Sequence, residues 1–484
     1  DYDPPCSFGL PDGHCYSLWY NGHGLLAGQI HKGWFPNSKK GWNYGCGEYG
    51  AEGLDPLDLM QRRYPSEWLP QPGEEESEWT AARISHAQSA DMSHFFFDRP
   101  TTVAGWVEAS QEHQRFATKL MTDAFRRDER MVSCAIHLFI DAWPAGWMKS
   151  IVDCERRPKP AFFALRDSLA PLFVSLRSDR FAVWAGENLE TELWLCNDTP
   201  SAITDCKVQW QVEDASGKVL ASGTTDAEIP SCAPRFQGKI RWQAPDVSSR
   251  GKVTLRAALV DQQGQVLSSS PLTLDVFPRS NAVPAVPVLL SEADTAAGKL
   301  VAEVGETKPQ TVTAPTSSAS VAVASHWPED EKLAGQWLDW VAAGGKLILL
   351  DVPIGSYAFG EATMEVMRMG FAPSNFASRA TGHPLVEGME KQDFSYWYDP
   401  SVDHITPVLP YSFTGTGDWK AILVSGHSDW GVKRKPTFGA AELPHGAGQI
   451  IVCQARIVGR TSTNPSAALF VQRLLEPRTT TSAS

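Results

Sequence analysis

Short hydrophobic runs that end in polar or aromatic residues recur in the first third of the chain. They occupy residues 13–16, 44–48 and 131–139. Runs of this length are typical of strands that are buried on both faces of a sheet. Between the second and third runs, apolar residues at helical spacing predict a long helix over residues 101–127. The order strand, helix, strand predicts a β/α repeat with a parallel sheet.

The pattern of hydrophobic positions changes after residue 175, where apolar and polar residues begin to alternate with the period of a half-exposed strand. The alternating segments are residues 192–195, 207–212 and 252–257. Turn-forming residues at 214–217 and 261–264 are typical of β-hairpins. Evenly spaced short strands with such turns predict an antiparallel, immunoglobulin-like β-sandwich over residues 176–278.

A Pro-rich stretch at residues 278–287 predicts a linker. Beyond it the β/α pattern returns over residues 285–477, with a buried strand predicted at 346–351. Residues 465–475 predict the final helix, and we expect residues 478–484 to form a disordered tail. The chain therefore divides into two α/β regions on either side of a β-sandwich.

Length and charge narrow the class of protein. The chain has 484 residues, too many for one ordinary core, and this length predicts two to four domains. The formal net charge of −13 argues against a nucleic-acid partner, since phosphate binding needs a basic surface. No apolar run reaches about 18 residues, so we expect a soluble protein without a membrane partner. The first residues lack a signal-peptide pattern, and the sequence does not distinguish a cytoplasmic, periplasmic or secreted location.

The 9 cysteines are widely spaced and form no CxxC pair. Disulfide frameworks and zinc sites need closer or more regular spacing, so we expect mostly buried free thiols. The sequence also lacks a cluster of His, Cys and carboxylate residues at ligand spacing. We therefore expect no metal and no other cofactor.

The segment at residues 45–53 contains the strongest candidate for chemistry. Glu48 stands at the end of a hydrophobic strand and has glycines on both sides, which let a ligand or another backbone approach closely. The carboxyl ends of strands hold the active site of a β/α barrel, where a Glu can attack an anomeric carbon. The structural alternative is that Glu48 caps the next helix or pairs with an Arg.

Three segments in order carry a resemblance to a known family. They are residues 15–21, in which Tyr16 stands some thirty residues before the next segment, the triplet at 48–50, and residues 141–161. They resemble glycoside hydrolase family 2, the β-galactosidase, β-glucuronidase and β-mannosidase group. The resemblance implies that residues 1–175 form the C-terminal part of a (β/α)8 catalytic barrel, followed by the sandwich.

The resemblance also implies roles for individual residues. Glu48 is the expected nucleophile of a retaining exo-β-glycosidase, which hydrolyses terminal non-reducing β-linked sugars through a covalent glycosyl-enzyme intermediate. The expected substrate-binding residues are Tyr16, His14, Trp19, His137 and Trp143. Tyr16 would orient the nucleophile, and His137 stands where the family usually has a Trp. The alternatives are barrel packing for the tryptophans and a core position for His137.

The chain departs from the family at the second carboxylate. Retaining hydrolysis needs an acid/base about 5–5.5 Å from the nucleophile, and in the family this is a Glu that follows an Asn. The sequence contains no Asn-Glu dipeptide. We therefore expect the acid/base in missing upstream sequence, so that the N-terminal half of the same enzyme is a partner besides the carbohydrate substrate. The rival hypothesis is a non-catalytic carbohydrate-binding or scaffolding subunit.

Residues 285–477 resemble the class I glutamine-amidotransferase-like fold, which some glycosidases carry as an accessory domain. A working amidotransferase needs a Cys where a strand turns into a helix, but the matching place holds Asp351, and Cys453 lies within a late strand. We expect an inactive copy that serves packing or homo-oligomer contacts. A weaker rival is an active amidase that uses Cys453.

Overall fold

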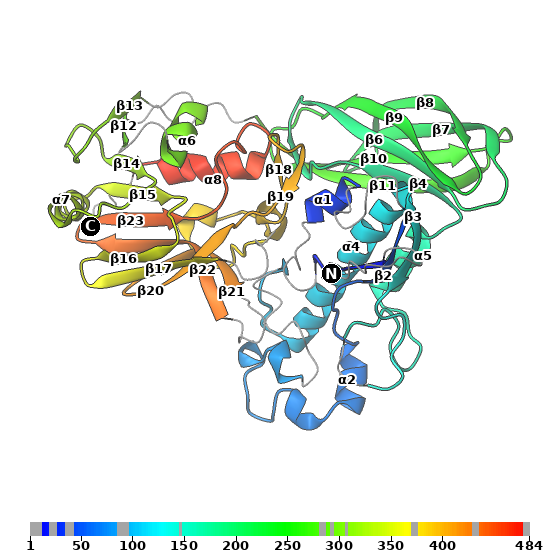
Figure 1. Cartoon of the computed structure of the whole chain (residues 1–484), viewed down its shortest axis with the longest axis horizontal. Coiled ribbons are helices and arrows are strands. Elements are labelled where there is room, and N and C mark those ends of the chain that lie inside the picture. Colours follow the sequence, from blue (N-terminus) through cyan, green and yellow to red (C-terminus); the bar gives the residue numbers. More distant parts are fainter. Residues whose placement is uncertain are drawn as a thin grey trace. The chain divides into compact units, whose positions relative to one another are not determined.

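The computed structural model describes residues 12–18, 27–33, 43–84, 96–144, 148–279, 287–290, 295–304, 308–368, 376–427 and 435–477. These residues belong to two compact units (Figure 1). The first unit comprises described residues of 1–92, 100–279 and 403–405, and the second those of 93–99, 280–402 and 406–484. None of the helices in these ranges is both long and apolar enough to span a membrane.

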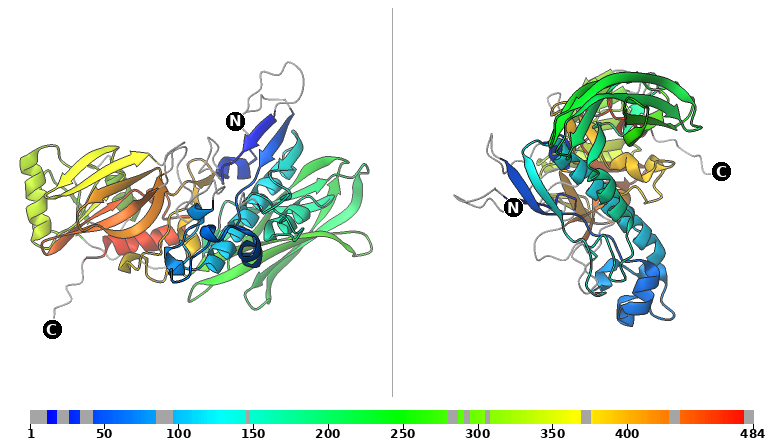
Figure 2. Two further views of the ribbon diagram at one scale, coloured as in Figure 1. Left: turned by 90° about the horizontal axis from the view of Figure 1, so that it is seen from below. Right: turned by 90° about the vertical axis from the view of Figure 1, so that its right-hand side faces the viewer.

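The first unit begins with a three-stranded parallel sheet in the order β1-β2-β3. Its strands are β1 (Asp12–Cys15), β2 (Tyr44–Tyr49) and β3 (Met131–Ile136). Helix α4 (Val103–Arg127) connects β2 to β3, as the sequence predicted, and starts where the Thr102 side chain accepts a hydrogen bond from Gly105 N. The buried face of α4 shares one apolar core with β1 and β2, and Figure 2 shows α4 beside the sheet. In the described residues the sheet is therefore open and does not close into a barrel.

The remaining helices of this part are short. They are α1 (Ala27–His31), α2 (Leu57–Arg63), η1 (Ser66–Trp68), η2 (Glu76–Glu78), η3 (Ala81–Arg83) and α5 (Pro160–Ser168). Helix α5 packs against α4 and begins with Pro160, whose missing N–H costs nothing in a first helical turn.

The prediction that residues 131–139 are buried on both faces is wrong. Strand β3 lies at the edge of the sheet, and half of its residues are exposed. Val132 in β3 is 47% exposed, and Phe139 and Ile140 just after it are also exposed. The hydrophobic run is typical of a buried strand, but within the described residues no fourth strand pairs with the free edge of β3.

The second part of the first unit is a β-sandwich. One sheet has the order β4-β6-β9 and the other β5-β11-β10-β7-β8. The strands are β4 (Leu172–Arg177), β5 (Ala182–Trp184), β6 (Asn188–Asn197), β7 (Ile203–Asp214), β8 (Val219–Ile229), β9 (Ala233–Gln243), β10 (Gly251–Val260) and β11 (Val266–Phe277). Inward-facing residues of both sheets form one apolar core.

Both predicted hairpin turns are present in the sandwich. Gly217 and Gly264 have φ of 83° and 79°, which suits glycine, and each N–H donates to the carbonyl of an aspartate three residues earlier. The side chains of these two aspartates, Asp214 and Asp261, accept further backbone hydrogen bonds within the turns. These turns join β7 to β8 and β10 to β11, and each pair of strands is antiparallel.

The second unit is built on one large mixed sheet in the order β13-β12-β14-β15-β23-β22-β20-β17-β16, with β21 paired to β22. Its strands are β12 (Pro287–Leu290), β13 (Lys308–Thr311), β14 (Val321–Ala324), β15 (Lys346–Leu350), β16 (Gly355–Phe359), β17 (Ala362–Arg368), β20 (Tyr411–Thr416), β21 (Lys420–His427), β22 (Lys435–His445) and β23 (Gly448–Cys453). The strands from β13 to β23 are parallel, and β22, β20, β17 and β16 extend the sheet in antiparallel pairs. The antiparallel half was not foreseen from the sequence.

Helices cover both faces of the parallel half of this sheet. They are α6 (Ala296–Val304), α7 (Glu331–Ala342) and α8 (Pro465–Leu475), and the last has the predicted bounds. Val288 and Leu290 share a core with α6 and α8, whereas Leu289 between them shares a core with α7. The shorter elements are η4 (Pro384–Val386), η5 (Lys391–Phe394), β18 (Trp397–Asp399) and β19 (His404–Thr406).

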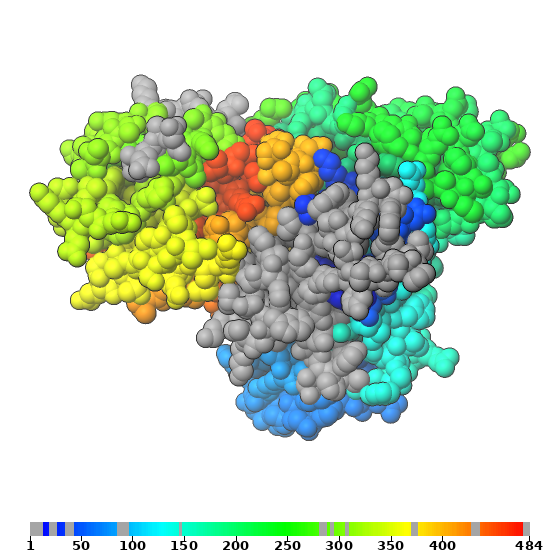
Figure 3. All heavy atoms as spheres, viewed as in Figure 1, coloured from blue at the N-terminus to red at the C-terminus, as the bar shows by residue number. Residues whose placement is uncertain are grey.

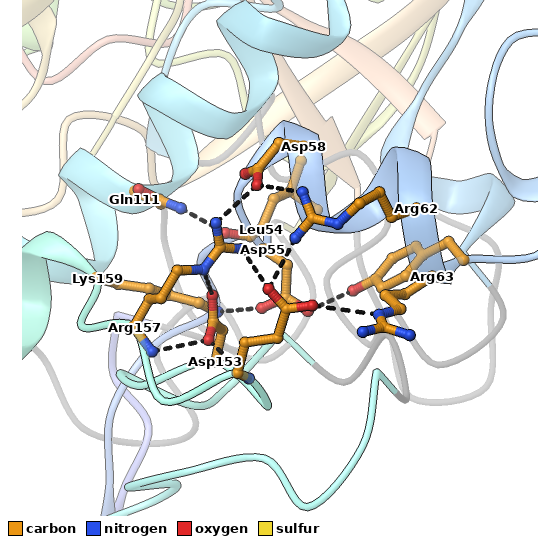
Figure 4. A network of polar contacts seen from close by, with 11 residues as sticks. Leu54, Asp55, Asp58, Arg62, Arg63, Gln111, Asp153, Arg157 and Lys159 are labelled. Atoms are coloured by element: carbon orange, nitrogen blue, oxygen red, sulfur yellow. Dashed lines mark hydrogen bonds and ion pairs between the residues drawn. The ribbon is translucent and has the colours of Figure 1, made fainter.

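A polar network ties the segment after β2 to the start of α5 (Figure 4). Asp55 and Lys159 form an ion pair of 2.9 Å, and both side chains are almost fully buried. The Tyr64 hydroxyl donates to Asp55 Oδ2 at 2.7 Å, and Lys159 Nζ donates to Gly53 O at 2.9 Å. Because these bonds satisfy both charges, the pair fixes the chain that leaves the Glu48 strand.

An exposed ring of ions surrounds this pair. Arg157 Nη1 and Arg62 Nη1 each lie 2.7 Å from Asp58 Oδ2, and Arg62 Nη2 lies 2.7 Å from Glu155 Oε2. Arg157 Nε also donates to the buried carboxylate of Asp153 at 2.8 Å. In the space-filling view of Figure 3, residues 57–84, in blue, lie beside the turquoise residues around 150 that carry the other half of the ring.

We expect the substitution K159M to lower the free energy of unfolding by about 3–5 kcal/mol, because it leaves the buried Asp55 carboxylate without a counter-charge. Urea unfolding followed by circular dichroism measures this loss. The control R62Q removes an exposed arginine from the ring and should change stability little, since water and salt screen exposed ion pairs. Equal losses in the two variants would contradict this account, and D55N/K159M should recover part of the loss.

Candidate active site

The position of Glu48 depends on one extra residue in β2. Asp12 pairs with Gly45 and His14 with Glu48, so β2 uses three steps where β1 uses two. The pairing with β3 has the same mismatch, from Cys46 to Tyr49. Such a bulge bends a strand and changes the direction of a side chain, and Gly45 and Gly47 leave room for it.

Tyr49, directly after Glu48, anchors the end of β2 on α4. Its hydroxyl lies 2.8 Å from Thr122 Oγ1, and its ring meets the Phe125 ring edge-on at 5.1 Å. Tyr49 is fully buried, whereas the side chain of Glu48 is 35% exposed. The buried neighbour therefore holds the strand while the carboxylate stays accessible to water or a ligand.

Three side chains from neighbouring strand ends surround the Glu48 carboxylate. The Tyr16 hydroxyl donates a short hydrogen bond to Glu48 Oε2. His14 Nδ1 lies 3.7 Å and His137 Nε2 3.9 Å from the same oxygen. The Tyr16 ring meets both imidazoles edge-on, with centroids 6.0 Å from His14 and 6.5 Å from His137. A carboxylate that is held by a phenol between two imidazoles and is partly exposed has the chemistry to act as a nucleophile or as a base.

The charge state of His137 follows from its surroundings. Burial lowers the pKa of His137 below its ordinary value, and Lys149 and His14 act in the same direction, whereas the Glu48 carboxylate raises it. The His137 backbone N–H donates to Tyr49 O at 2.9 Å, which fixes its position beside β2. A lowered pKa favours a neutral imidazole at pH 7, which both donates and accepts hydrogen bonds.

Lys149 and Glu52 belong to this site electrostatically, and neither was predicted from the sequence. Lys149 is 4% exposed, and burial lowers its pKa while Glu52 and Glu48 act against that effect. Glu52 is 1% exposed in the segment that follows β2. A usable signal was present, because Lys149 lies between the two segments, 141–144 and 157–161, that carry part of the family resemblance.

Gly50 allows the strand ends to approach each other. Its φ is 154°, and a Cβ on Gly50 would lie 2.9 Å from His137 O. A side chain here would push away the backbone that carries His137. Close packing of the two strand ends therefore requires a glycine after Glu48 and Tyr49.

The structure does not join every predicted residue to this cluster. Tyr16, His14 and His137 lie around Glu48, but Trp143 is 67% exposed, and no contact described for it reaches Glu48. Trp19 lies outside the described residues. The two tryptophans therefore stay predictions.

No second carboxylate is seen to contact Glu48 in the described part of the chain. Asp141, which follows the neighbouring strand β3, accepts a hydrogen bond from Ser150 Oγ at 2.8 Å, and burial raises its pKa. The described residues also contain no group of three or more His, Cys, Asp or Glu side chains that would hold a metal ion. The described residues therefore place no second carboxylate beside Glu48.

Cys453 is not placed to act as a nucleophile. It is fully buried within β23, and burial raises its pKa to about 12, which disfavours the thiolate. This environment argues against the amidase alternative.

Comparisons with known proteins give limited similarity. No protein-family model matches the sequence, and no curated protein sequence matches it. Among solved structures, the chain is similar to the β-D-mannosidase from Dictyoglomus thermophilum, with a TM-score of 0.40 and 17% identity over 54% of this chain and 30% of that one. It is also similar to the exo-chitosanase CsxA from Amycolatopsis orientalis, with a TM-score of 0.38 and 11% identity over 84% of this chain and 42% of that one. The chain spans less than half the length of either protein.

We expect E48Q to lower the pKa of His137 further, because it removes the negative charge that raises it, and K149Q to raise that pKa, because it removes a positive charge. Nuclear magnetic resonance titration of the His137 ring, assigned with H137Q, measures both shifts. A general structural change would not be expected to shift the pKa of His137 in opposite directions in the two variants, so the opposite signs serve as the control. An unchanged pKa in E48Q would contradict the described cluster.

Proposed function

We propose that this chain carries the nucleophile of a retaining exo-β-glycosidase that removes terminal non-reducing β-linked sugars. The observation that carries the proposal is the Glu48 carboxylate, which is 35% exposed at a parallel-strand end and accepts a hydrogen bond from Tyr16. Carboxyl ends of parallel strands are where β/α enzymes place their chemistry. The residues around Glu48, its place at a strand end and the exposure of its carboxylate all fit a side chain that bonds covalently to a sugar.

The reaction has two steps. Glu48 Oε attacks the anomeric carbon, the bond from that carbon to the leaving oxygen breaks, and an acid donates a proton to the leaving group. Water, deprotonated by the same acid/base, then attacks the anomeric carbon and releases Glu48. The Tyr16 hydroxyl holds the carboxylate in one orientation, so that less entropy is lost on reaction.

The imidazoles of His14 and His137 flank the place where the sugar would lie. We propose that they bind substrate hydroxyls, with His137 in the position that family 2 usually gives to a Trp. A neutral imidazole recognises a hydroxyl by a directional hydrogen bond, whereas an indole stacks on an apolar sugar face. Trp143, which is well exposed, would add such a face.

The acid/base is the part that we place outside this chain. The sequence has no Asn-Glu dipeptide, and the carboxylate that retaining hydrolysis requires would lie about 5–5.5 Å from Glu48. We propose that the N-terminal half of the same enzyme supplies it, with residues 1–175 as the C-terminal part of the barrel. We propose in addition that the sandwich is of the immunoglobulin-like type and that the second unit is an amidotransferase-like domain. A homo-oligomer is also part of this proposal.

We expect E48Q in the complete enzyme to lower turnover of an aryl β-glycoside by about three orders of magnitude or more, because the amide cannot form the covalent intermediate. A 2-fluoro sugar should label the wild-type peptide that contains Glu48 and leave E48Q unlabelled, as mass spectrometry would show. The matched control E78Q changes an exposed glutamate on η2 and should keep full activity. Full turnover in E48Q would refute the assignment.

We expect Y16F in the complete enzyme to lower kcat by about 10- to 100-fold, since a hydrogen bond to a charged group is worth about 1.5–3 kcal/mol. Labelling by the 2-fluoro sugar should become slower but still occur, which separates an orienting residue from the nucleophile. Wild-type rates of labelling in Y16F would contradict the role of Tyr16. If the complete protein neither hydrolyses any β-glycoside nor is labelled by one, the non-catalytic carbohydrate-binding alternative replaces the proposal.

A further inference from the structure

A cavity of about 420 Å³ lies in the second unit, at the edge of its sheet where parallel strands end. Leu350 and Asp351 reach it from the end of β15, and residues 455–458 and Arg460 follow the end of β23. Ala296 and Lys299 come from the first turn of α6, and Pro410 and Tyr411 from the start of β20. The volume is within the usual range for small-ligand sites, about 300–1,000 Å³.

The strand order shows which strand ends form the cavity. From β12 the chain passes through α6 to β13 on one side, and then returns to β14 on the other side of β12. Helices α6 and α7 cover opposite faces of the sheet. The cavity lies beyond β14, at the carboxyl ends of β15 and β23, and the carboxyl ends of parallel strands are the usual ligand position in open α/β sheets.

Positive charge dominates the lining. Lys299 and Arg456 are exposed, and neither forms an ion pair with any residue in the described ranges. Lys299 lies in the first turn of helix α6, at the positive end of the helix dipole, and the N–H groups of Ala297 and Gly298 in this turn already donate to Ser325 Oγ and Thr295 Oγ1. The exposed cations, rather than free N–H groups of the helix, therefore favour an anionic group.

Arg460 adds a third positive charge to the lining. It is 7% exposed, its Nη2 donates to Asp399 Oδ2 at 2.6 Å and to Thr406 Oγ1 at 3.0 Å, and its Nη1 donates to Val458 O. Its Nε is buried and has no hydrogen-bond partner among the described residues. These bonds fix the guanidinium, so that its charge stays beside the cavity with Lys299 and Arg456.

The loop after β23 is held in place before any ligand binds. Glu303 at the end of α6 accepts hydrogen bonds from Gly459 N at 2.7 Å and from Thr461 N at 3.0 Å. The loop that carries Arg456 and Arg460 is therefore tied to the helix that carries Lys299. Fixed cations bind an anion with less loss of entropy than mobile ones.

The opposite side of the cavity is less basic. Asp351 is exposed and has φ of 51°, a left-handed conformation that is uncommon outside glycine and asparagine and that concentrates at functional sites. Its backbone N–H donates to Cys453 O, so the residue is fixed between β15 and β23. A carboxylate there accepts hydrogen bonds from hydroxyl groups, and Tyr411 and Ile457 supply apolar surface.

We propose that this cavity binds a monosaccharide-sized molecule that carries a phosphate or a carboxylate group. The anionic group lies against Lys299 and Arg456, close to the positive charge of Arg460, and the ligand hydroxyls donate to Asp351. The site is separate from Glu48 and does not depend on the glycosidase proposal. It gives the second unit a ligand-binding role in place of a purely structural one.

Isothermal titration calorimetry of the whole chain with inorganic phosphate, glucose 6-phosphate, glucuronate and glucose tests the proposal. We expect at least one of the two anionic sugars to bind and glucose not to bind; which of the two binds distinguishes a phosphate ligand from a carboxylate ligand. K299Q/R456Q should weaken that binding by about 10- to 100-fold, because it removes both exposed cations that attract the anionic group.

The control K332Q/K391Q removes the same charge from two exposed lysines of the second unit that do not line the cavity, and should bind like the wild type. D351N, which tolerates the left-handed backbone, should weaken the anionic sugar but not inorganic phosphate. Binding in E48Q should equal that of the wild type. No binding of either anionic sugar, or equal weakening in the cavity and control variants, would overturn the proposal.

Discussion

The bulge in β2 is the constraint on which the candidate site depends. Without the extra residue between Gly45 and Glu48, the period of two along a strand would place the carboxylate on the opposite face of the sheet. The bulge turns Glu48 toward His14 and Tyr16 while Tyr49 remains buried against α4. The two glycines make this irregular geometry possible in an otherwise apolar strand.

Burial sets the electrostatics around Glu48 as much as charge does. Lys149 and His137 are partly or fully removed from water, so each has a lowered pKa in spite of the nearby carboxylate. Desolvation and the neighbouring carboxylate thus oppose each other at both residues. The buried Asp55–Lys159 pair lies outside this cluster and fixes the backbone that follows it, since both of its charges are satisfied by hydrogen bonds.

The two candidate sites follow one rule of sheet architecture, although they lie in different units. Each is at the carboxyl ends of parallel strands, where side chains from segments far apart in the sequence meet around a common space. Glu48 and His137 lie far apart in the sequence, and so do Lys299 and Arg456. The chemistry differs: the first site presents a carboxylate between imidazoles, and the second presents cations around a cavity.

Local patterns in the sequence determined the elements whose causes are local. Alternation, together with four-residue turns that begin with Asp and end with Gly, predicted the sandwich hairpins. Helical spacing predicted α4, and α8 has its predicted bounds. The glycines around Glu48 and the Tyr at position 16 also identified two residues that the fold brings into contact. Only the tertiary structure decided the bulge in β2, the exposure of β3, the burial of Lys149 and the unpaired Nε of Arg460. These features depend on which distant strand or loop lies alongside, and the period of hydrophobic residues along the chain contains no information about that neighbour.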